Sequence, residues 1–165
     1  MPAPRSRRTV DTPLGRYTLT ATDEAIVGVW RDGQSHYPDP DRLGDEAPGQ
    51  HRLLDEAQSQ LLAYLQGERD SFDLPVAPTG TPFQLAVWEH LTRIPRGATT
   101  TYGEIAAALE RPRAAQAVGA AVGANPLSII VPCHRVIAAD GSLTGYAGGI
   151  EVKRSLLELE GALPA

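Results

Sequence analysis

The sequence predicts an α+β protein in two parts: a small sheet domain over residues 1–78 and a mostly helical domain over residues 79–165. Three observations favour this division. β-Branched and aromatic residues concentrate before residue 32, helix start signals recur after residue 79, and the segment between them, 73–81 (DLPVAPTGT), contains Pro and Gly. The 165 residues, 42% of them apolar, are enough for one domain or two small ones.

Strands are expected over residues 9–31, as a hairpin or meander. The first run, TVDTPLGRYTLTAT, is interrupted at 13–15, and the second, AIVGVWRDG, ends at the turn signal 32–33. Residues 34–49 are rich in Pro, Gly and Asp and predict a loop. A helix then runs up to Gly67, and its apolar stripe is formed by Leu54, Ala57, Leu61 and Leu65. This half carries no evident chemistry.

The second half opens with a strong helix start. Thr81 stands at the N-cap position, Pro82 at the first helical position, and Gln84 completes a capping box. The helix is expected to end at Pro95. Its buried stripe is predicted to consist of Phe83, Val87, Leu91 and Ile94.

Two short helices with a tight break between them follow, which is a helix-turn-helix pattern. Thr101 and Glu104 form a second capping box, residues 111–112 (RP) interrupt the helix, and RAAQAVGAAVGAN resumes it. Small side chains allow this second helix to approach either another helix or a nucleic-acid groove closely. They are Ala114, Ala115, Ala117, Gly119, Ala120, Ala121 and Gly123.

An apolar run comes next. Residues 127–131 (LSIIV) predict a buried strand that delivers Pro-Cys-His-Arg-Val at 132–136. Residues 141–149 (GSLTGYAGG) predict a Gly-rich turn region, and 151–161 predict a C-terminal helix.

Charge is unevenly distributed. The 15 basic and 20 acidic residues give a net charge of -5, which argues against a protein that coats nucleic acid non-specifically. The excess acidity lies in residues 1–78, since residues 79–165 hold 7 residues of each sign. Between residues 93 and 135 the balance is positive, which predicts either a modest basic surface or an ordinary solvated face. The charged residues there are Arg93, Arg96, Arg111, Arg113 and Arg135 against Glu104 and Glu110.

The sequence predicts a cytoplasmic protein. The start, MPAPRSRRTVD, is charged and lacks the apolar stretch of a secretory signal. The longest uncharged stretch, 114–133, contains polar residues and prolines, so we expect no membrane segment. The single cysteine suits a reducing compartment and excludes both an intrachain disulfide and a multi-cysteine zinc site.

That cysteine, Cys133, is followed by His134 and Arg135. A positive or hydrogen-bonding neighbour lowers the pKa of a thiol and makes it a nucleophile, so the residues needed for nucleophilic catalysis are present. The alternative is a small buried side chain beside a chance histidine. Neighbours in an extended chain point to opposite faces, so His134 needs a turn or a bridging water to act on Cys133.

Several motifs in register across residues 79–161 resemble the O6-alkylguanine-DNA alkyltransferase family. The densest match, NPLSIIVPCHRV at 125–136, is similar to the family's active-site signature. Further matches are TPFQ at 81–84, VW at 87–88, IPRG at 94–97, TYGEIA at 101–106, GYAGG at 145–149 and the final helix from 153 to 161. The first half resembles the family only in outline. The resemblance implies an RNase-H-like sheet domain followed by a winged-helix-type domain.

What the resemblance implies is a DNA repair protein that reacts once. The family flips a damaged guanine out of double-stranded DNA, and its thiolate takes the alkyl group from O6 irreversibly. Cys133 is then the nucleophile and alkyl acceptor, His134 relays its proton through a water, and Glu160 orients His134. No cofactor is required, because the damaged DNA is the alkyl donor, and no structural zinc is expected.

Further roles follow from the same resemblance. Asn125 holds the turn that presents the active-site segment, and Tyr102 rotates the phosphate 3′ of the lesion and donates a hydrogen bond to the guanine. The base pocket is formed by Val136, Tyr146 and Ala147. Minor-groove DNA contacts are expected from Arg113, Ala114, Ala115, Gln116, Gly119 and Arg135.

One position departs from the family pattern. The recognition helix of the family carries an arginine that fills the gap left by the flipped nucleotide, and here that position is Gln116. An amide supplies less stacking and no charge, so we expect weaker or slower processing of duplex lesions. Arg113 lies one helical turn earlier and is a candidate for partial substitution.

Three alternatives remain at this point. The first is an alkyltransferase-like protein that binds the lesion without repairing it, although such proteins lack the acceptor cysteine that is present here. The second is a thiol hydrolase with a Cys-His-Glu triad, for which the sequence gives no sign of an oxyanion hole. The third is a plain helix-turn-helix regulator, which leaves PCHRV unexplained. A monomer is expected, with cooperative clustering on DNA and O4-alkylthymine repair left open.

Overall fold

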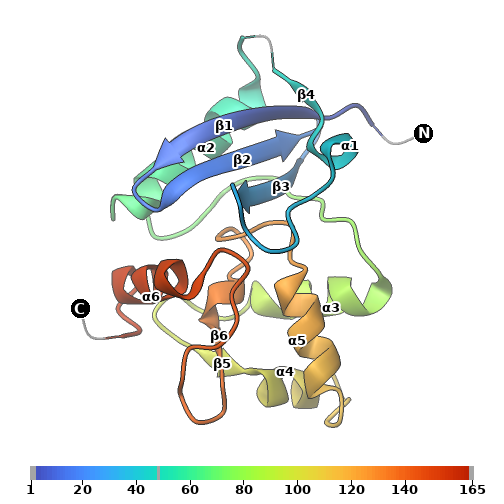
Figure 1. Ribbon diagram of the computed structural model, residues 1–165, viewed down its shortest axis with the longest axis vertical. Coiled ribbons are helices and arrows are strands. Elements are labelled where there is room, and N and C mark those ends of the chain that lie inside the picture. The colour runs from blue at the N-terminus through green and yellow to red at the C-terminus, as the bar shows by residue number, and fades with distance from the viewer. Residues whose placement is uncertain (1–2, 48, 164–165) are drawn as a thin grey trace. The chain divides into compact units, whose positions relative to one another are not determined.

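The computed structural model describes residues 3–47 and 49–163. The chain divides into two compact units, Met1–Thr79 and Gly80–Ala165, here called the sheet unit and the helical unit (Figure 1). The predicted α+β class, with a sheet domain before a mostly helical one, is confirmed. No helix in the described residues combines the length and apolar character that crossing a membrane requires.

The sheet unit is built on a strongly paired antiparallel meander. β1 (Ser6–Thr12), β2 (Gly15–Ala21) and β3 (Ile26–Arg31) pair in sequence order, and a two-residue β4 (Asp45–Glu46) adds to β1 in parallel. The interruption predicted at 13–15 is a true hairpin turn, in which Gly15 has φ 113°. The region therefore holds three strands rather than two.

The segment predicted as a loop, 34–49, contains two short elements. They are α1 (Pro40–Leu43) and β4. Pro at the first helical turn and Gly44 at the C-cap with φ 86° bound α1, while Thr20 Oγ1 donates a hydrogen bond to the Leu43 carbonyl at 2.9 Å. Such short elements are held by contacts with the sheet and leave no periodic signal in the sequence.

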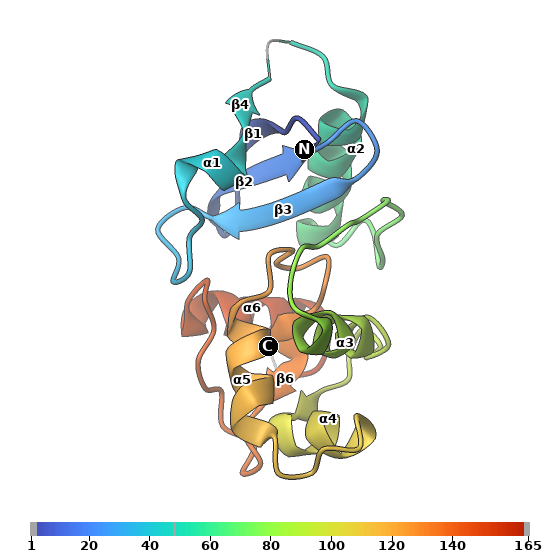
Figure 2. The same cartoon turned by 90° about the vertical axis from the view of Figure 1, so that its right-hand side faces the viewer.

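The sheet-unit core lies between the meander and α2 (Arg52–Leu65). Figure 2 shows α2 on one face of the sheet and α1 on the other. The alternation of the strands explains this, since Tyr17 and Leu19 point to one face and Thr18 and Thr20 to the other. The predicted helix stripe is right except at its end, where Tyr64 rather than Leu65 is the buried residue.

The helical unit begins with α3 (Pro82–Leu91), which ends four residues before the predicted stop at Pro95. Its capping box is formed as predicted. Thr81 Oγ1 accepts a hydrogen bond from the backbone N–H of Gln84, and Oε1 of the Gln84 side chain accepts one from the backbone N–H of Thr81. Trp88, which the predicted stripe omits, is buried and donates from Nε1 to the Ala121 carbonyl at 2.8 Å. This bond joins α3 to α5 (Ala115–Gly123).

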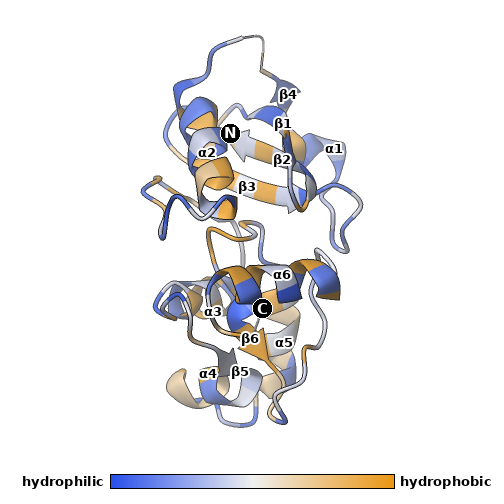
Figure 3. Ribbon diagram, turned by 90° about the vertical axis from the view of Figure 1, so that its left-hand side faces the viewer, coloured by the Kyte–Doolittle hydropathy of each residue, from blue (hydrophilic) through white to orange (hydrophobic). Residues whose placement is uncertain are grey.

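α4 (Tyr102–Ala108) completes the helix-turn-helix pattern, and it packs on α5. The second predicted capping box, Thr101 with Glu104, is also present. Thr100–Thr101 forms β5, which pairs in parallel with β6 (Val136–Ile137), one of the hydrophobic segments coloured orange in Figure 3. The last helix, α6, spans Ile150–Leu159.

Residues 127–131 do not form the strand that their apolar character predicts. They form a tight turn in which Val131 N–H bonds the Leu127 carbonyl at 2.9 Å and Ile129 has φ 72°. A β-branched residue in this left-handed region is uncommon and indicates that its surroundings hold it there. The turn feeds directly into the short 3₁₀ helix η1 (Cys133–Arg135).

Candidate active site

The helix η1 turns the backbone at the three residues that carry the proposed chemistry. All three side chains are buried, and Cys133 is 5% exposed. Burial raises the pKa of the Cys133 thiol, while a hydrogen bond from Asn125 and the positive charge of Lys153 act in the opposite direction. Because Cys133–Arg135 form a 3₁₀ helix, the chain does not have the extended geometry in which the side chains of Cys133 and His134 would point to opposite faces.

His134 is fixed by an acidic side chain from the end of α6. Its Nε2 lies 2.8 Å from Oε2 of Glu160, and both side chains are fully buried. Arg135 also donates two hydrogen bonds to Glu160, which makes the carboxylate oxygens acceptors and assigns the ring proton of neutral His134 to Nε2. Nδ1 then carries the lone pair, and it makes no hydrogen bond within the described residues.

Burial also determines the protonation of His134. It lowers the pKa of the imidazole, the Glu160 carboxylate raises that pKa in part, and the charges of Arg135 and Lys153 lower it further. The net direction is downward, so the neutral ring is favoured near pH 7. A neutral imidazole with a free lone pair can accept a proton from a thiol.

Arg135 does not lie where the sequence analysis placed it. Its Nε and one Nη bond Glu160 at 2.9 Å, the other Nη donates to the Ile94 carbonyl at 2.6 Å, and the residue is only 8% exposed. This burial argues against the DNA contact predicted for Arg135. An arginine beside a buried carboxylate forms a bidentate pair readily, so its charge is directed inward.

Asn125 holds together the turn before η1. Its Nδ2 donates to the Val131 carbonyl at 2.9 Å, and its Oδ1 accepts from Leu127 N–H at 3.0 Å. The residue is buried, so these hydrogen bonds replace water for two backbone groups. The same amide acts to lower the pKa of the Cys133 thiol, against the effect of burial.

Tyr102 and Gly119 lie against each other at the junction of α4 and α5. A Cβ atom added to Gly119 would stand 3.7 Å from Cδ1 of Tyr102, which is ordinary van der Waals contact with the ring. Both residues are half-buried. Tyr102 is the first residue of α4 and is therefore held by the capped start of that helix.

The segment 145–149 places Tyr146 and Ala147 just before α6. Both are half-buried, and Gly148 allows the Tyr146 ring to lie close to the backbone, because a Cβ at Gly148 would meet Cε2 of that ring at 2.8 Å. Val136, the third predicted pocket residue, is fully buried in β6 and directly follows η1.

Sequence comparison identifies the family. Residues 82–162 match the family model described as 6-O-methylguanine DNA methyltransferase, DNA binding domain, and residues 7–78 match its ribonuclease-like domain. The chain belongs to the 6-O-methylguanine DNA methyltransferase family. A methylated-DNA--protein-cysteine methyltransferase of Methanosarcina acetivorans is 45% identical over 153 residues, covering 92% of this chain and 96% of the relative.

Solved structures agree with this membership. The O6-methylguanine methyltransferase of Mycobacterium tuberculosis superposes with a TM-score of 0.85 at 45% identity and covers 98% of this chain and 96% of that one. The Mycobacterium tuberculosis OGT in complex with DNA gives a TM-score of 0.86 at 44% identity, covering 95% and 93% of the two chains.

The helix α5 of this family member exposes a narrow face of small residues. Arg113, before the helix, and Gln116, Ala117 and Ala120 within it are exposed at helical spacing, whereas Val118, Ala121 and Val122 are buried. Ala114, Ala115 and Gly119, which the sequence analysis assigned to DNA contact, are half-buried beside this face. Ala117 and Ala120, which the sequence analysis named only among the small side chains of this helix, belong to the exposed face.

The basic surface predicted between residues 93 and 135 is smaller than expected. Arg93 pairs with Glu89 at 3.0 Å, Arg96 donates to the Leu159 carbonyl at 3.0 Å, and Arg135 is buried. Arg111 and Arg113 stay exposed and line a hollow with Pro112 and Ala114, in the turn between α4 and α5. Positive charge in this part of the unit is thereby concentrated at the start of α5.

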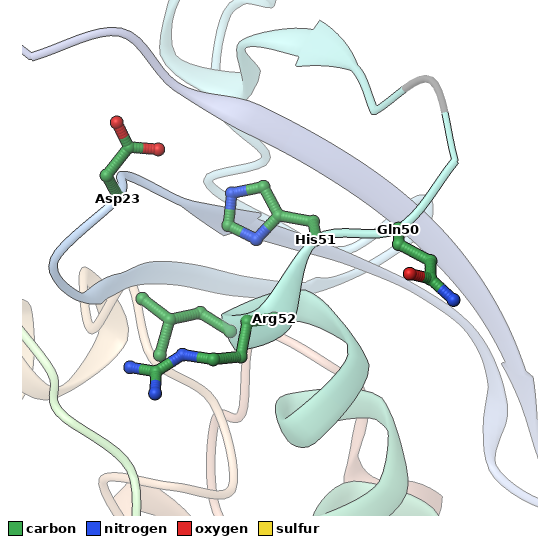
Figure 4. A pocket seen from close by; sticks show the side chains of 5 residues that line it. Asp23, Gln50, His51 and Arg52 are labelled. Carbon is green, nitrogen blue, oxygen red and sulfur yellow. The ribbon is translucent and has the colours of Figure 1, made fainter.

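Another hollow lies in the sheet unit, lined by Asp23, Gln50, His51, Arg52 and Leu53 (Figure 4). His51 is the N-cap of α2 and accepts from Leu54 N–H through Nδ1 at 3.3 Å, so its polar edge serves the helix start. Among the described residues, no group of three or more His, Cys, Asp or Glu side chains is placed to hold a metal ion.

Sequence reasoning also missed the buried Lys153 on α6. Its Nζ donates to the Val136 and Thr144 carbonyls, and the residue is 1% exposed. A signal existed: Lys153 lies three residues before Leu156 and seven before Glu160, on the apolar stripe of α6 rather than on its polar face.

Proposed function

We propose that this protein removes alkyl groups from O6 of guanine in double-stranded DNA and transfers them to Cys133, once per molecule. The observation that carries the proposal is the buried Cys133–His134–Glu160 arrangement, in which Glu160 fixes Nε2 of His134 and leaves the Nδ1 lone pair to accept the thiol proton. The sequence comparisons support it, because the relatives at 45% identity are named methylated-DNA--protein-cysteine methyltransferases.

The proposed reaction is a single displacement. The thiol proton passes to His134, through a bridging water, and the thiolate sulfur attacks the alkyl carbon. A new S–C bond forms as the C–O6 bond breaks, and the electron pair stays on the guanine oxygen. The guanine anion then takes up a proton, so the net change exchanges the thiol hydrogen for the alkyl group. A thioether has no return path, and no cofactor enters the balance.

Extrusion of the base explains how a buried thiol meets its substrate. A stacked guanine does not expose O6 to in-line attack, and flipping it into a pocket costs a few kcal/mol, less where the lesion weakens pairing. We assign the pocket to Val136, Tyr146 and Ala147, which follow η1 and precede α6. Tyr102 would turn the 3′ phosphate and donate to the guanine ring, and Asn125 holds the turn before Cys133.

The exposed face of α5 is the proposed minor-groove surface. Small side chains permit close approach to the groove, and the sparse base-edge information there suits a protein that must find lesions in any sequence. Gln116 stands at the centre of this face and would enter the base stack, Ala114, Ala115 and Gly119 would line its sides, and Arg113 would contact a phosphate. The proposal also places the protein in the cytoplasm, because a free thiol persists in a reducing compartment. It further includes a monomeric state.

The deciding experiment uses a duplex that contains one O6-methylguanine. We expect the intact protein to gain the mass of one methyl group, and peptide mapping to locate it on Cys133. Cys133→Ser should bind the duplex without gaining mass. Binding by the unmodified protein without any mass gain would instead identify a lesion-binding protein that does not repair. Repeated turnover of small esters or amides would indicate a thiol hydrolase.

A further inference from the structure

The backbone around Glu160 is fixed in part by the way α6 ends. The last carbonyls of a helix find no partner within it. Here Gly161 N–H donates to the Glu158 carbonyl at 3.1 Å, and Ala162 N–H donates to the Leu157 carbonyl at 2.9 Å. These two bonds form a Schellman motif with Glu160 at the C-cap. The motif leaves the next carbonyl, that of residue 159, to a donor from another segment.

Arg96 supplies that donor. Its Nη2 donates to the Leu159 carbonyl at 3.0 Å, across 63 residues of chain but within the helical unit. The arginine is half-buried, and the last turn of α6 contains no basic residue. The guanidinium group therefore brings to this helix end both a hydrogen bond and the positive charge that a helix C-terminus favours. It acts on the backbone next to Glu160 rather than on the carboxylate.

A tight turn after α3 presents Arg96 to this helix end. Ala98 N–H donates to the Pro95 carbonyl at 3.0 Å, and Gly97, at the third position of the turn, has φ 90°. These features are typical of a type II turn. The turn also lies close to α6, because a Cβ atom added to Gly97 would stand 3.2 Å from the carbonyl oxygen of Glu160.

The same segment, residues 94–97, holds the guanidinium group that bonds the Glu160 side chain. Arg135 donates to the Ile94 carbonyl at 2.6 Å and to both carboxylate oxygens of Glu160 at 2.9 Å. One of those oxygens lies 2.8 Å from Nε2 of His134. The segment thus contacts the backbone beside Glu160 and also the side chain that holds its carboxylate.

We propose that Arg96 is a positioning residue: by anchoring the C-terminal end of α6, it keeps the Glu160 carboxylate against Nε2 of His134. Arg96 acts through Glu160 and not on the thiol. This inference rests on the proposed function, because it gives Arg96 a part in that proton transfer. The hydrogen bond between His134 and Glu160 is nevertheless measurable without DNA.

The principal test compares Arg96→Met, Arg96→Lys and Arg93→Met. Arg93 is the matched control, because its guanidinium group pairs with Glu89 at the surface. We expect methyl transfer by Arg96→Met to slow about tenfold, since a small displacement of a catalytic group is costly even when its cause lies outside the site. Arg96→Lys restores a charged donor and should recover most of the rate, and Arg93→Met should match the unmodified protein.

Two results of this comparison would overturn the proposal. The first is an unchanged transfer rate in Arg96→Met. The second is an equal loss in Arg96→Lys and Arg96→Met, because the two side chains are similar in length and differ in the charged donor.

Combination with Glu160→Gln tests whether Arg96 acts through that carboxylate. Substitutions that affect the same interaction give effects that do not add. The double variant Arg96→Met, Glu160→Gln should therefore transfer only slightly more slowly than Glu160→Gln alone. Full multiplication of the two single effects would show that Arg96 acts by another route, against the proposal.

The ring N–H proton of His134 gives a readout that a purely structural arginine would not move. Charge-assisted hydrogen bonds are strong, so this proton should resonate far downfield in NMR and exchange slowly with water. His134→Gln identifies the signal by removing it. In Arg96→Met we expect the signal to move upfield and to exchange faster. An unchanged signal in a folded variant that has only lost resistance to urea would make Arg96 merely structural. If Arg96→Met does not fold, Arg96→Gln, whose side chain is shorter, takes its place.

A phosphate contact is the competing explanation for an arginine in this unit. In the Cys133→Ser background, Arg96→Met should leave both duplex affinity and its salt dependence unchanged. A slope of log affinity against log salt reduced by about 1 would instead assign Arg96 to DNA and overturn the proposal. If the unmodified protein accepted no methyl group from DNA, the proposed function would fail, while the ring-proton measurement would still decide whether Arg96 holds Glu160 against His134.

Discussion

Oε2 of Glu160 lies 2.8 Å from Nε2 of His134, at the C-cap of α6 and inside a fully buried environment. The carboxylate also accepts two hydrogen bonds from Arg135, so a single acidic side chain both orients the proposed base and neutralises a buried cation. The proposed alkyl transfer and the stability of the fold therefore both depend on this residue.

Replacing this carboxylate should lower both properties at once. In Glu160→Gln, Arg135 loses its counter-charge, and breaking a buried pair costs about 3–5 kcal/mol of the free energy of unfolding. Methyl transfer should also slow about 100-fold, because His134 loses the group that fixes its tautomer. Urea unfolding and single-turnover mass spectrometry measure the two effects. Glu151→Gln, on the exposed face of the same helix, is the control and should change neither.

The turn before Cys133 should depend on Asn125. Asn125→Ala leaves the Val131 carbonyl and Leu127 N–H without their partners and should cost about 2–5 kcal/mol of unfolding free energy. Asn125→Asp keeps the acceptor for Leu127 N–H but loses the donor to Val131, so it separates the two contributions. Loss of the amide should also raise the pKa of Cys133, read by iodoacetamide alkylation across pH. An alanine variant with unchanged stability and alkylation would refute this role.

The pH dependence should follow His134. Burial holds the pKa of His134 below 6.5, so the base stays neutral and methyl transfer should remain on its plateau at pH 6.5 and fall at more acidic pH. The folded state binds this proton less readily than the unfolded state. The contribution of His134 to stability is thus present above pH 6.5 and lost as the pH falls through the folded value. Measurements from about pH 5 to 8 test both effects: transfer rates for the reaction and urea midpoints for stability. His134→Gln is the control, because it removes the titration of His134 from the stability curve.

Two arginines should separate DNA contact from internal structure. Arg113→Gln should reduce the slope of log affinity against log salt by about 1 with little change in stability, as expected for one lost phosphate contact. Arg135→Gln should destabilise the fold by about 3–5 kcal/mol, because the buried Glu160 carboxylate loses the guanidinium that balances its charge. A folded Arg135→Gln protein with a reduced salt slope would restore the DNA contact that its burial argues against.

Gln116 should limit the processing of duplex lesions. Gln116→Arg adds charge and a planar group able to stack, so duplex affinity and transfer rate should both rise. Filter binding with the Cys133→Ser background gives affinity, and mass spectrometry of the active protein gives rate. If the arginine variant leaves both unchanged, the amide at this position is as effective as the family's arginine. Gln116→Glu serves as the opposite-charge control and should weaken binding.

The sequence predicted those parts of the molecule that local chemistry determines. Both capping boxes, the helix-turn-helix and the two-part α+β class depend on residues close together in the chain, and all are present. The predicted strand at 127–131 was wrong because the side chain of Asn125 bonds both ends of that run and bends it into a turn. Apolar periodicity contains no record of a side-chain bond of this kind.

Buried charge was the other feature that the sequence analysis did not predict. Arg135 was expected to contact DNA, and no role or environment was predicted for Lys153, yet both are buried against partners from elsewhere in the fold. Cys133 and His134 were singled out from the residues themselves and Glu160 through the resemblance, and the structure supplies the distance that relates His134 to Glu160. On α5, Gln116 is exposed, whereas Ala114, Ala115 and Gly119, which were also predicted to contact DNA, are half-buried.

The burial of Cys133 has a consequence for the protein between encounters with damaged DNA. A molecule that reacts once loses its whole capacity to any stray electrophile or oxidant, and thiol oxidation follows exposure and ionisation. With 5% of its surface exposed and its pKa raised by burial, Cys133 is shielded on both counts. The working lifetime of the unreacted protein is thus governed by how often the η1 turn opens locally, which hydrogen exchange at its backbone amides can time.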